Sequence, residues 1–215
     1  MKNKIISILF FNGLTYCAPL ITTINLLFTI QMLLLNIIAI LLFITQPSLS
    51  VKETMDKEKS DKFSVALIIA GCIICQIFSV IEWACFRRSF HDFTSDTFTF
   101  LAITFIICGL ILRISAIRTL GKYFTGTVQI QADQKIIQSG VYKFIRHPSY
   151  MGAYLVMVGN AILLHAYIGI CISLVAMFAV YYFRIKVEET ELIKNFGAQY
   201  SEYKKRTKKL IPYIY

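Results

Sequence analysis

The sequence predicts an all-α protein, a polytopic bundle of about six transmembrane helices. Hydrophobic residues make up 57% of the 215 residues and charged residues only 16%, a balance outside the range of ordinary soluble proteins. The mean hydropathy of +0.65 agrees with this class. The apolar residues also gather in long windows, and a helix needs about 20 of them to cross a bilayer. We therefore expect an integral membrane protein.

Four apolar windows have the length of a membrane span, and two shorter ones are expected to be spans as well. The long windows are residues 25–45, 63–85, 97–117 and 166–183, and the shorter ones are residues 5–22 and 149–165. The first window follows Met-Lys-Asn-Lys, as a signal peptide would. However, the Ala-Pro-Leu at 18–20 is a poor cleavage site, and apolar sequence continues to Thr45. We expect the first two windows to form a retained hairpin.

The positive charge of the chain is distributed unevenly across the predicted membrane. Six spans place the amino terminus and residues 46–62, 118–148 and 184–215 on one side. That side, together with Arg113 at a span end, carries 20 of the 22 Lys and Arg residues. The positive-inside rule makes this face cytoplasmic, in the endoplasmic reticulum of a eukaryote or the inner membrane of a prokaryote. We expect the basic tail KKRTKK at 204–209 to be attracted to anionic lipid headgroups, at about 1 kcal/mol per charge near the surface, and we expect no nucleic-acid partner despite the net charge of +10.

The six cysteines all lie in or beside apolar windows, and no disulfide framework is visible. Cys72 and Cys75 form a C-x-x-C within a predicted helix. There is no second pair and no nearby histidine, so we expect packing residues and no metal site.

Two connecting segments have distinct patterns. The third span ends in Glu82 and Trp83, where we expect the tryptophan at the membrane interface and the carboxylate paired with Arg87 or Arg88. In residues 121–138, the alternation at 127–131 predicts an extended segment followed by a turn. No glycine-rich phosphate fingerprint occurs, so the membrane scaffold itself must hold any nucleotide-like cofactor.

A polar island at 140–152, GVYKFIRHPSYMG, holds the first candidate site residues. Pro148 is suited to the first position of a helix, which places His147 at or near the helix cap. The backbone N–H groups of residues 149–151 would then be free to meet a carboxylate or phosphate, with added positive charge from Arg146. Ionisable groups beside a membrane span are candidates for function.

A second polar block begins where the last span ends. Arg184 and Glu188 lie four residues apart on one helical face, a spacing that also fits a plain interfacial salt bridge. The two preceding spans form a hairpin that returns the chain to its starting side. We therefore expect Arg184 and Glu188 to lie beside His147 and Tyr150.

This order of motifs resembles the isoprenylcysteine carboxyl methyltransferase family. It comprises GVYxxxRHPSYxG, a membrane hairpin, R-x-x-x-E-E, a tail with Phe196, Gly197, Tyr200 and Tyr203, and a late Pro212. The resemblance covers residues 118–215 and implies methyl esterification by S-adenosylmethionine at the cytoplasmic face of a membrane. It implies a catalytic region at 118–215, with residues 1–117 as scaffold and lipid access.

The resemblance also implies individual roles. Arg184 matches the family's substrate-binding arginine, and Glu188 matches the carboxylate that binds the cofactor. The remaining residues implied to bind the cofactor are Gln129, Gln134, Lys135, Ile136, Ile137, Tyr142, His147, Pro148, Ser149 and Tyr150. At Gln134 the eukaryotic enzymes have histidine, and Lys135 departs as well, so only backbone contacts are expected there.

The residue types suit S-adenosylmethionine. Glu188 offers an acid to its cations, the helix start offers donors to its carboxylate, and Tyr142 or Tyr150 offers an aromatic face. A carboxylate acceptor with a pKa of ~3.5 is already ionised at neutral pH and needs no general base. Positioning would then supply most of the catalysis, up to roughly 7–11 kcal/mol, with Arg184 as a two-pronged donor to the acceptor.

Several alternatives remain open on sequence alone. His147 is of a type that exchanges protons near neutral pH, which would suit methyl transfer to a phospholipid amine or to a lipid hydroxyl or phenol. An NADPH-dependent membrane reductase of the steroid reductase type carries a similar R-H-P-x-Y-x-G motif. A non-catalytic scaffold would use the hairpin only for assembly. In each case Tyr200, Tyr203, Tyr213 and Phe196 are expected to dock on the membrane surface.

Overall fold

The computed structural model describes residues 2–46, 62–126 and 133–211. In these residues every regular element is helical, and the single β feature is an isolated bridge between Ile145 and Lys208. The α-helices are α1 (Lys2–Asn12), α2 (Ile30–Thr45), α4 (Lys62–Phe86), α5 (Thr97–Leu120), α6 (Pro148–Leu163), α7 (Tyr167–Phe196) and α8 (Ala198–Arg206). The predicted all-α class is confirmed, whereas the extended segment predicted at 127–131 lies outside the described residues.

Each of the six predicted windows contains a helix, but the helices differ in length. Three are long and apolar enough to cross a membrane, namely Phe63–Phe86, Thr97–Tyr123 and Tyr167–Phe196. The first window is broken, because α1 passes into a π-helix at Gly13–Cys17 and a 3-10 turn at Ala18–Leu20. The chain is thus an integral membrane protein with three helices of spanning length in its described part.

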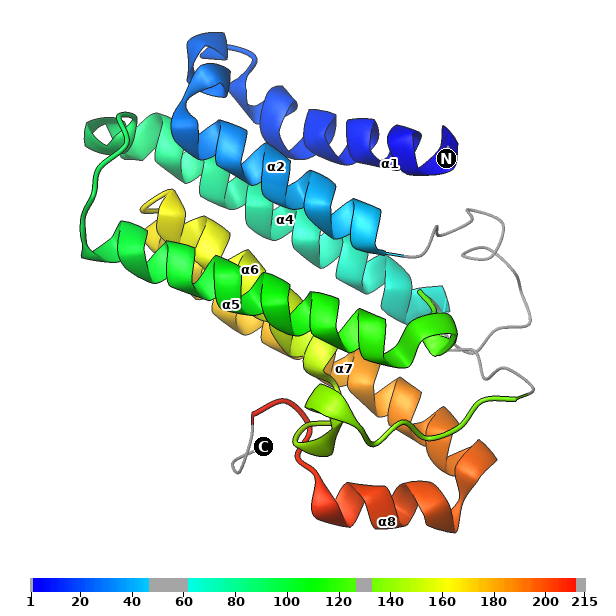
Figure 1. Ribbon diagram of the computed structural model, residues 1–215. Coiled ribbons are helices and arrows are strands. Elements are labelled where there is room, and N and C mark those ends of the chain that lie inside the picture. The colour runs from blue at the N-terminus through cyan, green and yellow to red at the C-terminus, as the bar shows by residue number, and fades with distance from the viewer. Residues whose placement is uncertain (1, 47–61, 127–132, 212–215) are drawn as a thin grey trace.

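The long helices run side by side, with α1 and α2 at the edge away from α7 and α8 (Figure 1). Helix α5 packs extensively on α6, and α4 packs on α7. Gly109 of α5 and Gly152 of α6 touch directly, since a Cβ built on either would lie 2.6 Å from the other's carbonyl oxygen. Such contacts let helix backbones approach closely in membranes. This packing fixes the start of α6 against α5.

The end of the bundle farthest from α8 is closed by polar contacts. Glu82 accepts hydrogen bonds from Arg87 (2.8 Å) and from the backbone N–H of Gly169 (2.8 Å), so it stabilises the start of α7. The predicted pairing of Glu82 with Arg87 is confirmed. The Trp83 side chain does not face lipid, as a residue of the interfacial aromatic belt would, because it is fully buried and its Nε1 donates to the Phe90 carbonyl.

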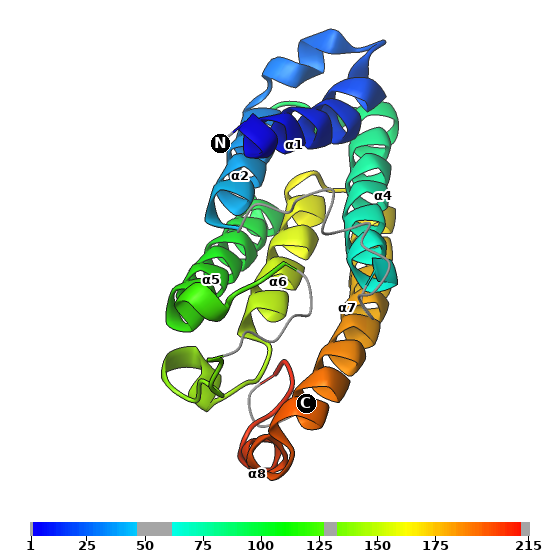
Figure 2. The same cartoon turned by 90° about the vertical axis from the view of Figure 1, so that its right-hand side faces the viewer.

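The carboxyl-terminal segment turns back beneath α7 (Figure 2). Gly197, with φ +51°, separates α7 from α8 in a backbone conformation that favours glycine. Beyond α8, Lys208 pairs with the loop before α6: the N–H of Arg146 donates to the Lys208 carbonyl at 2.8 Å. The tail therefore holds the polar island in place from below.

Candidate active site

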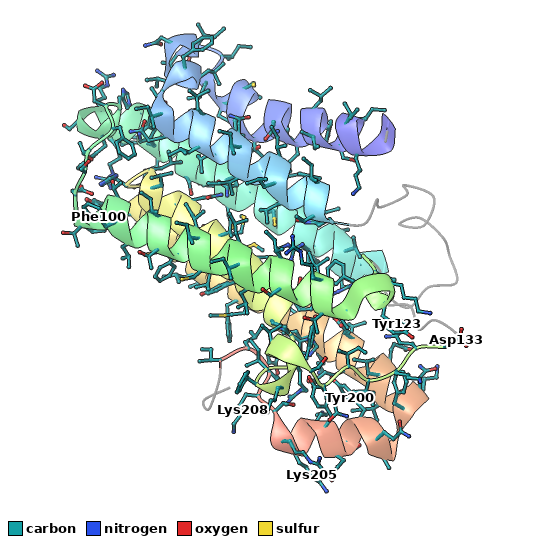
Figure 3. All side chains as sticks on the ribbon, viewed as in Figure 1. Phe100, Tyr123, Asp133, Tyr200, Lys205 and Lys208 are labelled. Atoms are coloured by element: carbon teal, nitrogen blue, oxygen red, sulfur yellow. The ribbon has the colours of Figure 1, made fainter. Side chains whose placement is uncertain are left out.

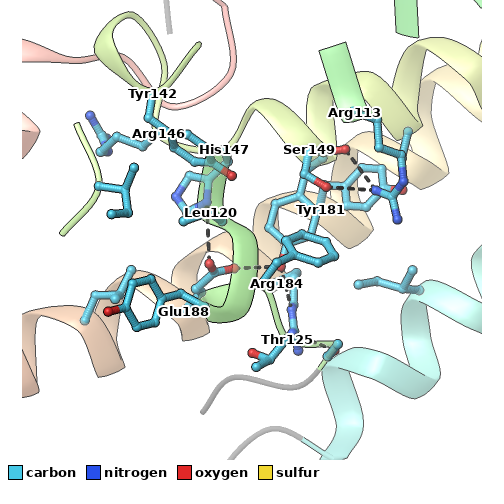
Figure 4. A pocket seen from close by; sticks show the side chains of 18 of the residues that line it. Arg113, Leu120, Thr125, Tyr142, Arg146, His147, Ser149, Tyr181, Arg184 and Glu188 are labelled. Carbon is cyan, nitrogen blue, oxygen red and sulfur yellow. Dashed lines mark hydrogen bonds and ion pairs between the residues drawn. The ribbon is translucent and has the colours of Figure 1, made fainter. Parts of the chain in front are cut away.

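A cavity of about 250 Å³ lies at the end of the bundle where α6, α7 and α8 meet. Figure 4 shows that His147 and Ser149, at the start of α6, and Arg184 and Glu188, in the second half of α7, gather around it. The predicted site residues that line the cavity are Gln134, Lys135, Ile136, Ile137, Tyr142, His147, Ser149, Tyr150, Arg184 and Glu188. Pro148 is not among the lining residues, and Gln129 lies outside the described part of the chain.

The start of α6 is built as its sequence predicts, with one exception. Pro148 is the first helical residue and His147 is the N-cap. A helix start leaves its first backbone N–H groups without intrahelical partners, which here are those of Ser149 and Tyr150. The N–H of Met151 was expected to be free as well, but it donates to the His147 carbonyl at 3.2 Å. Among the residues that the structure describes, two donors, not three, therefore remain available to an anion.

A hydrogen-bonded relay joins Arg184 to Glu188. The Nε of Arg184 donates to the Tyr150 hydroxyl at 3.0 Å, and that hydroxyl donates to Oε2 of Glu188 at 2.6 Å. The guanidinium also donates to Ser64 Oγ (2.6 Å) and to the Gly126 carbonyl (3.2 Å). Arg184 is only 3% exposed, so its orientation is fixed by these partners.

Arg113 is a site residue that sequence reasoning missed, since it was counted only as a charge at a span end. It is buried in α5, lines the cavity, and donates through Nη1 to the Ser149 carbonyl (3.1 Å) and hydroxyl (2.9 Å). Within residues 2–46, 62–126 and 133–211, no carboxylate forms an ion pair with it. A buried cation without an anion is costly, so this guanidinium suits an anionic ligand. Its position inside an apolar window was the available signal.

Glu189, the last residue of the R-x-x-x-E-E motif, is a second site residue to which the sequence assigned no role. Its buried carboxylate accepts from Arg146 Nε at 2.8 Å, lies 3.4 Å from His147 Nε2, and pairs with Lys204 Nζ at 3.3 Å. Arg146 also donates to the Thr207 carbonyl. Arg146 directly precedes the N-cap residue His147, as its place in the sequence requires, but Glu189 pairs with its charge and the tail accepts its other hydrogen bonds.

The tyrosines of α8 face inward, in contrast to the predicted membrane docking. Tyr200 and Tyr203 are 2% and 5% exposed and line the cavity, while Lys205 points outward on the other side of the helix (Figure 3). The Tyr203 hydroxyl donates to the Tyr142 carbonyl at 2.7 Å. Burial raises the pKa of Tyr203 to about 12, which keeps it a donor at neutral pH. The docking prediction is wrong for these two residues, and Tyr213 lies outside the described residues.

Another part of the cavity wall is apolar. Side chains from three helices line it: Leu42 of α2, Val65, Ile68, Ile69 and Cys72 of α4, and Leu120 of α5. The cavity thus joins a charged region around Arg184 and Glu188 to an apolar region between α2, α4 and α5. This combination suits a ligand or ligand pair that is polar at one end and lipid-like at the other.

Comparison with known proteins finds similarity to the family that the sequence motifs resemble. Residues 101–194 match the model of the isoprenylcysteine carboxyl methyltransferase (ICMT) family. Protein-S-isoprenylcysteine O-methyltransferase B of Arabidopsis thaliana is 37% identical over 114 residues, which are 52% of this chain and 58% of that protein. The Saccharomyces cerevisiae protein-S-isoprenylcysteine O-methyltransferase is 34% identical over 118 residues, 54% of this chain and 49% of that protein. The chain therefore spans about half the length of these curated relatives.

A solved structure shares the fold. The eukaryotic intramembrane Ras methyltransferase ICMT superposes with a TM-score of 0.61 over 86% of this chain and 76% of that chain, at 22% identity. The predicted resemblance is thereby confirmed: this chain carries the sequence pattern of the isoprenylcysteine carboxyl methyltransferase family over residues 101–194 and has the fold of that ICMT.

Proposed function

We propose that this protein is a membrane methyltransferase that transfers a methyl group from S-adenosylmethionine to the carboxylate of a prenylated cysteine or a similar lipid-like acceptor. The observation that carries the proposal is the fixed array Arg184–Tyr150–Glu188, which lies where the charged and apolar parts of one cavity meet. The curated relatives named above are isoprenylcysteine O-methyltransferases, in agreement with this activity.

The residues around the cavity fit S-adenosylmethionine. The Glu188 carboxylate is 29% exposed and can face a cation, whereas Arg113 and the N–H groups of Ser149 and Tyr150 can meet a carboxylate. Aromatic and aliphatic side chains supply flat walls for a nucleoside: Ile136, Ile137, Tyr142, Phe196, Tyr200 and Tyr203. The cofactor-binding roles assigned from the family resemblance are therefore proposed for the residues that line this cavity.

Arg184 is proposed to orient the acceptor. Its guanidinium is positively charged and held rigidly, so it can fix a carboxylate oxygen in line with the methyl carbon. When bound, S-adenosylmethionine supplies an electrophilic methyl group: a new O–CH₃ bond forms, the S–CH₃ bond breaks, and a neutral thioether leaves. The acceptor is already an anion at neutral pH, so this chain need not remove a proton.

The apolar region of the cavity between α2, α4 and α5 is proposed to admit the lipid part of the acceptor from the bilayer. Residues 118–215 would carry most catalytic groups. Residues 1–117 would supply the scaffold and the apolar region of the cavity, together with Arg113, which contacts Ser149, and Ser64, which contacts Arg184. We further propose six membrane passes, with α1, α2 and α6 joining the three long helices. With six passes, the charge distribution supports a cytoplasmic position for the cavity.

Labelling of membranes tests this function. Membranes that contain the protein are incubated with S-adenosylmethionine carrying a labelled methyl group and with a farnesylated cysteine acceptor. We expect the label to be released as methanol by mild base, because base hydrolyses methyl esters. Label in base-stable products would instead support an amine, hydroxyl or phenol acceptor. Protection from heat unfolding by NADPH, without any by S-adenosylmethionine, would support the reductase alternative.

A further inference from the structure

His147 lies between two carboxylates with different partners. Its Nε2 is 3.4 Å from Oε1 of Glu189, and its Nδ1 is 4.0 Å from Oε1 of Glu188. The imidazole is buried, whereas Glu188 is partly open to the cavity. Figure 4 shows His147 above Glu188 at the cavity wall. Each ring nitrogen of His147 therefore faces a different carboxylate.

The surroundings of Glu189 determine which nitrogen carries the proton. Its Oε1 accepts from Arg146 Nε, and its Oε2 pairs with Lys204. A carboxylate between two cations remains ionised, so Glu189 can only accept a hydrogen bond from His147. The proton of a neutral imidazole is thus placed on Nε2, and Nδ1 keeps its lone pair as an acceptor.

The second acceptor comes from Glu188. Its Oε2 is occupied by the Tyr150 hydroxyl, so Oε1 is the oxygen that remains toward Nδ1 of His147. Two acceptors 4.0 Å apart cannot bond to each other and need a donor between them. One ammonium nitrogen about 2.9 Å from each atom satisfies both. Both residues line the cavity, so a ligand there can provide this group.

We propose that Glu189 is a positioning residue: it keeps Nδ1 of His147 an acceptor, so that this atom and Oε1 of Glu188, both in residues already proposed to bind the cofactor, can hold its α-ammonium together. This proposal rests on the proposed function. Glu189 itself does not touch the cofactor; it acts through the ring of His147. The site separates ammonium binding from Arg184, which is left to the acceptor.

Two ligands isolate the ammonium contribution. S-adenosylhomocysteine and its desamino analogue differ only in the α-amino group, so the ratio of their dissociation constants measures what that group contributes. In the wild-type protein we expect S-adenosylhomocysteine to bind at least about tenfold more tightly, since hydrogen bonds to charged groups contribute roughly 1.5–3 kcal/mol. Failure of the wild-type protein to bind either ligand would count against the proposed function itself.

Two variants of Glu189 then test the positioning role. In Glu189→Leu the acceptor for Nε2 is lost, and we expect the ratio to fall toward one. In Glu189→Gln the amide oxygen can still accept from Arg146 and His147, so we expect the ratio to persist although the charge and the Lys204 pair are gone. Equal ratios in wild type and Glu189→Leu would overturn the proposal, as would a collapse in Glu189→Gln that matches Glu189→Leu.

The tautomer of His147 gives an independent measurement if Glu189→Leu fails to fold. Side-chain ¹⁵N spectra of histidine-labelled wild-type protein, assigned with His147→Gln, report which ring nitrogen is protonated. We expect a protonated Nε2 and an unprotonated Nδ1, with the Nδ1 resonance shifting when S-adenosylhomocysteine binds. A proton on Nδ1, alone or together with Nε2, would overturn the proposal while leaving the proposed function intact.

Discussion

The Tyr150 hydroxyl accepts a hydrogen bond from Arg184 at 3.0 Å and donates one to Glu188 at 2.6 Å, so a single phenol couples the proposed acceptor-binding and cofactor-binding groups. The coupling crosses from α6 to α7, two helices joined by a tight turn at residues 164–166. It fixes the relative position of a cation and an anion that lie four residues apart on α7.

Tyr150→Phe tests this coupling by removing only the hydroxyl. We expect turnover to fall by about tenfold or more, because Arg184 and Glu188 each lose a charge-assisted hydrogen bond of roughly 1.5–3 kcal/mol. Methyl transfer to a farnesylated cysteine measures the effect. The matched control is Tyr154→Phe on the same helix, whose hydroxyl donates to the Leu174 carbonyl away from the cavity. Wild-type turnover in Tyr150→Phe would show that the relay has no role in positioning.

The two buried tyrosines of α8 should respond differently to loss of their hydroxyls. The Tyr203 hydroxyl is bonded to the Tyr142 carbonyl, whereas the Tyr200 hydroxyl is buried without a partner in the described residues. We expect Tyr203→Phe to lower the free energy of unfolding by about 1 kcal/mol and Tyr200→Phe to leave it unchanged or raise it. Thermal unfolding in detergent compares them, and equal losses in both variants would contradict the assigned hydrogen bonds.

The contact between α5 and α6 should not tolerate a side chain. Gly152→Ala places a Cβ 2.6 Å from the Gly109 carbonyl oxygen and 2.7 Å from the Arg113 nitrogen, both backbone atoms. We expect a loss of about 1–3 kcal/mol in the free energy of unfolding as the helices move apart. Gly13→Ala is the control, since nothing lies within 4 Å of its new Cβ. A Gly152→Ala protein as stable as Gly13→Ala would show that the helices do not pack this closely.

Arg113 should contribute to ligand binding more than to stability. Arg113→Met removes a buried charge that forms no ion pair within the described residues, and such replacements are often neutral for folding. We expect the unfolding temperature to change little, while the affinity for S-adenosylhomocysteine falls by about tenfold. The exposed Arg118 in the last turn of α5 supplies the control Arg118→Met, which should leave affinity unchanged. Equal affinities in the two variants would remove Arg113 from the site.

The parts of the site predicted from sequence are those with local signals. Pro148 fixes the helix start by its own backbone geometry, and the spacing of Arg184 and Glu188 follows from the helix period. The errors concern contacts between distant segments. Trp83, Tyr200 and Tyr203 are of residue types common at membrane interfaces, but their side chains are buried against segments that only the fold brings next to them. Arg113 and Glu189 were missed for the same reason, since their partners lie 36 and 43 residues away in sequence.

Glu188 is proposed to bind the cofactor, and Arg184 is proposed to bind the acceptor. Calorimetric titration of S-adenosylhomocysteine into Glu188→Gln and Arg184→Lys tests it most directly, because both substitutions keep approximate size and Arg184→Lys also keeps the charge. We expect Glu188→Gln to bind at least about tenfold more weakly than wild type, as a lost charge-assisted contact predicts. Arg184→Lys should bind nearly as tightly as wild type. Wild-type affinity in Glu188→Gln, or a loss in Arg184→Lys as large as that in Glu188→Gln, would contradict this division of roles.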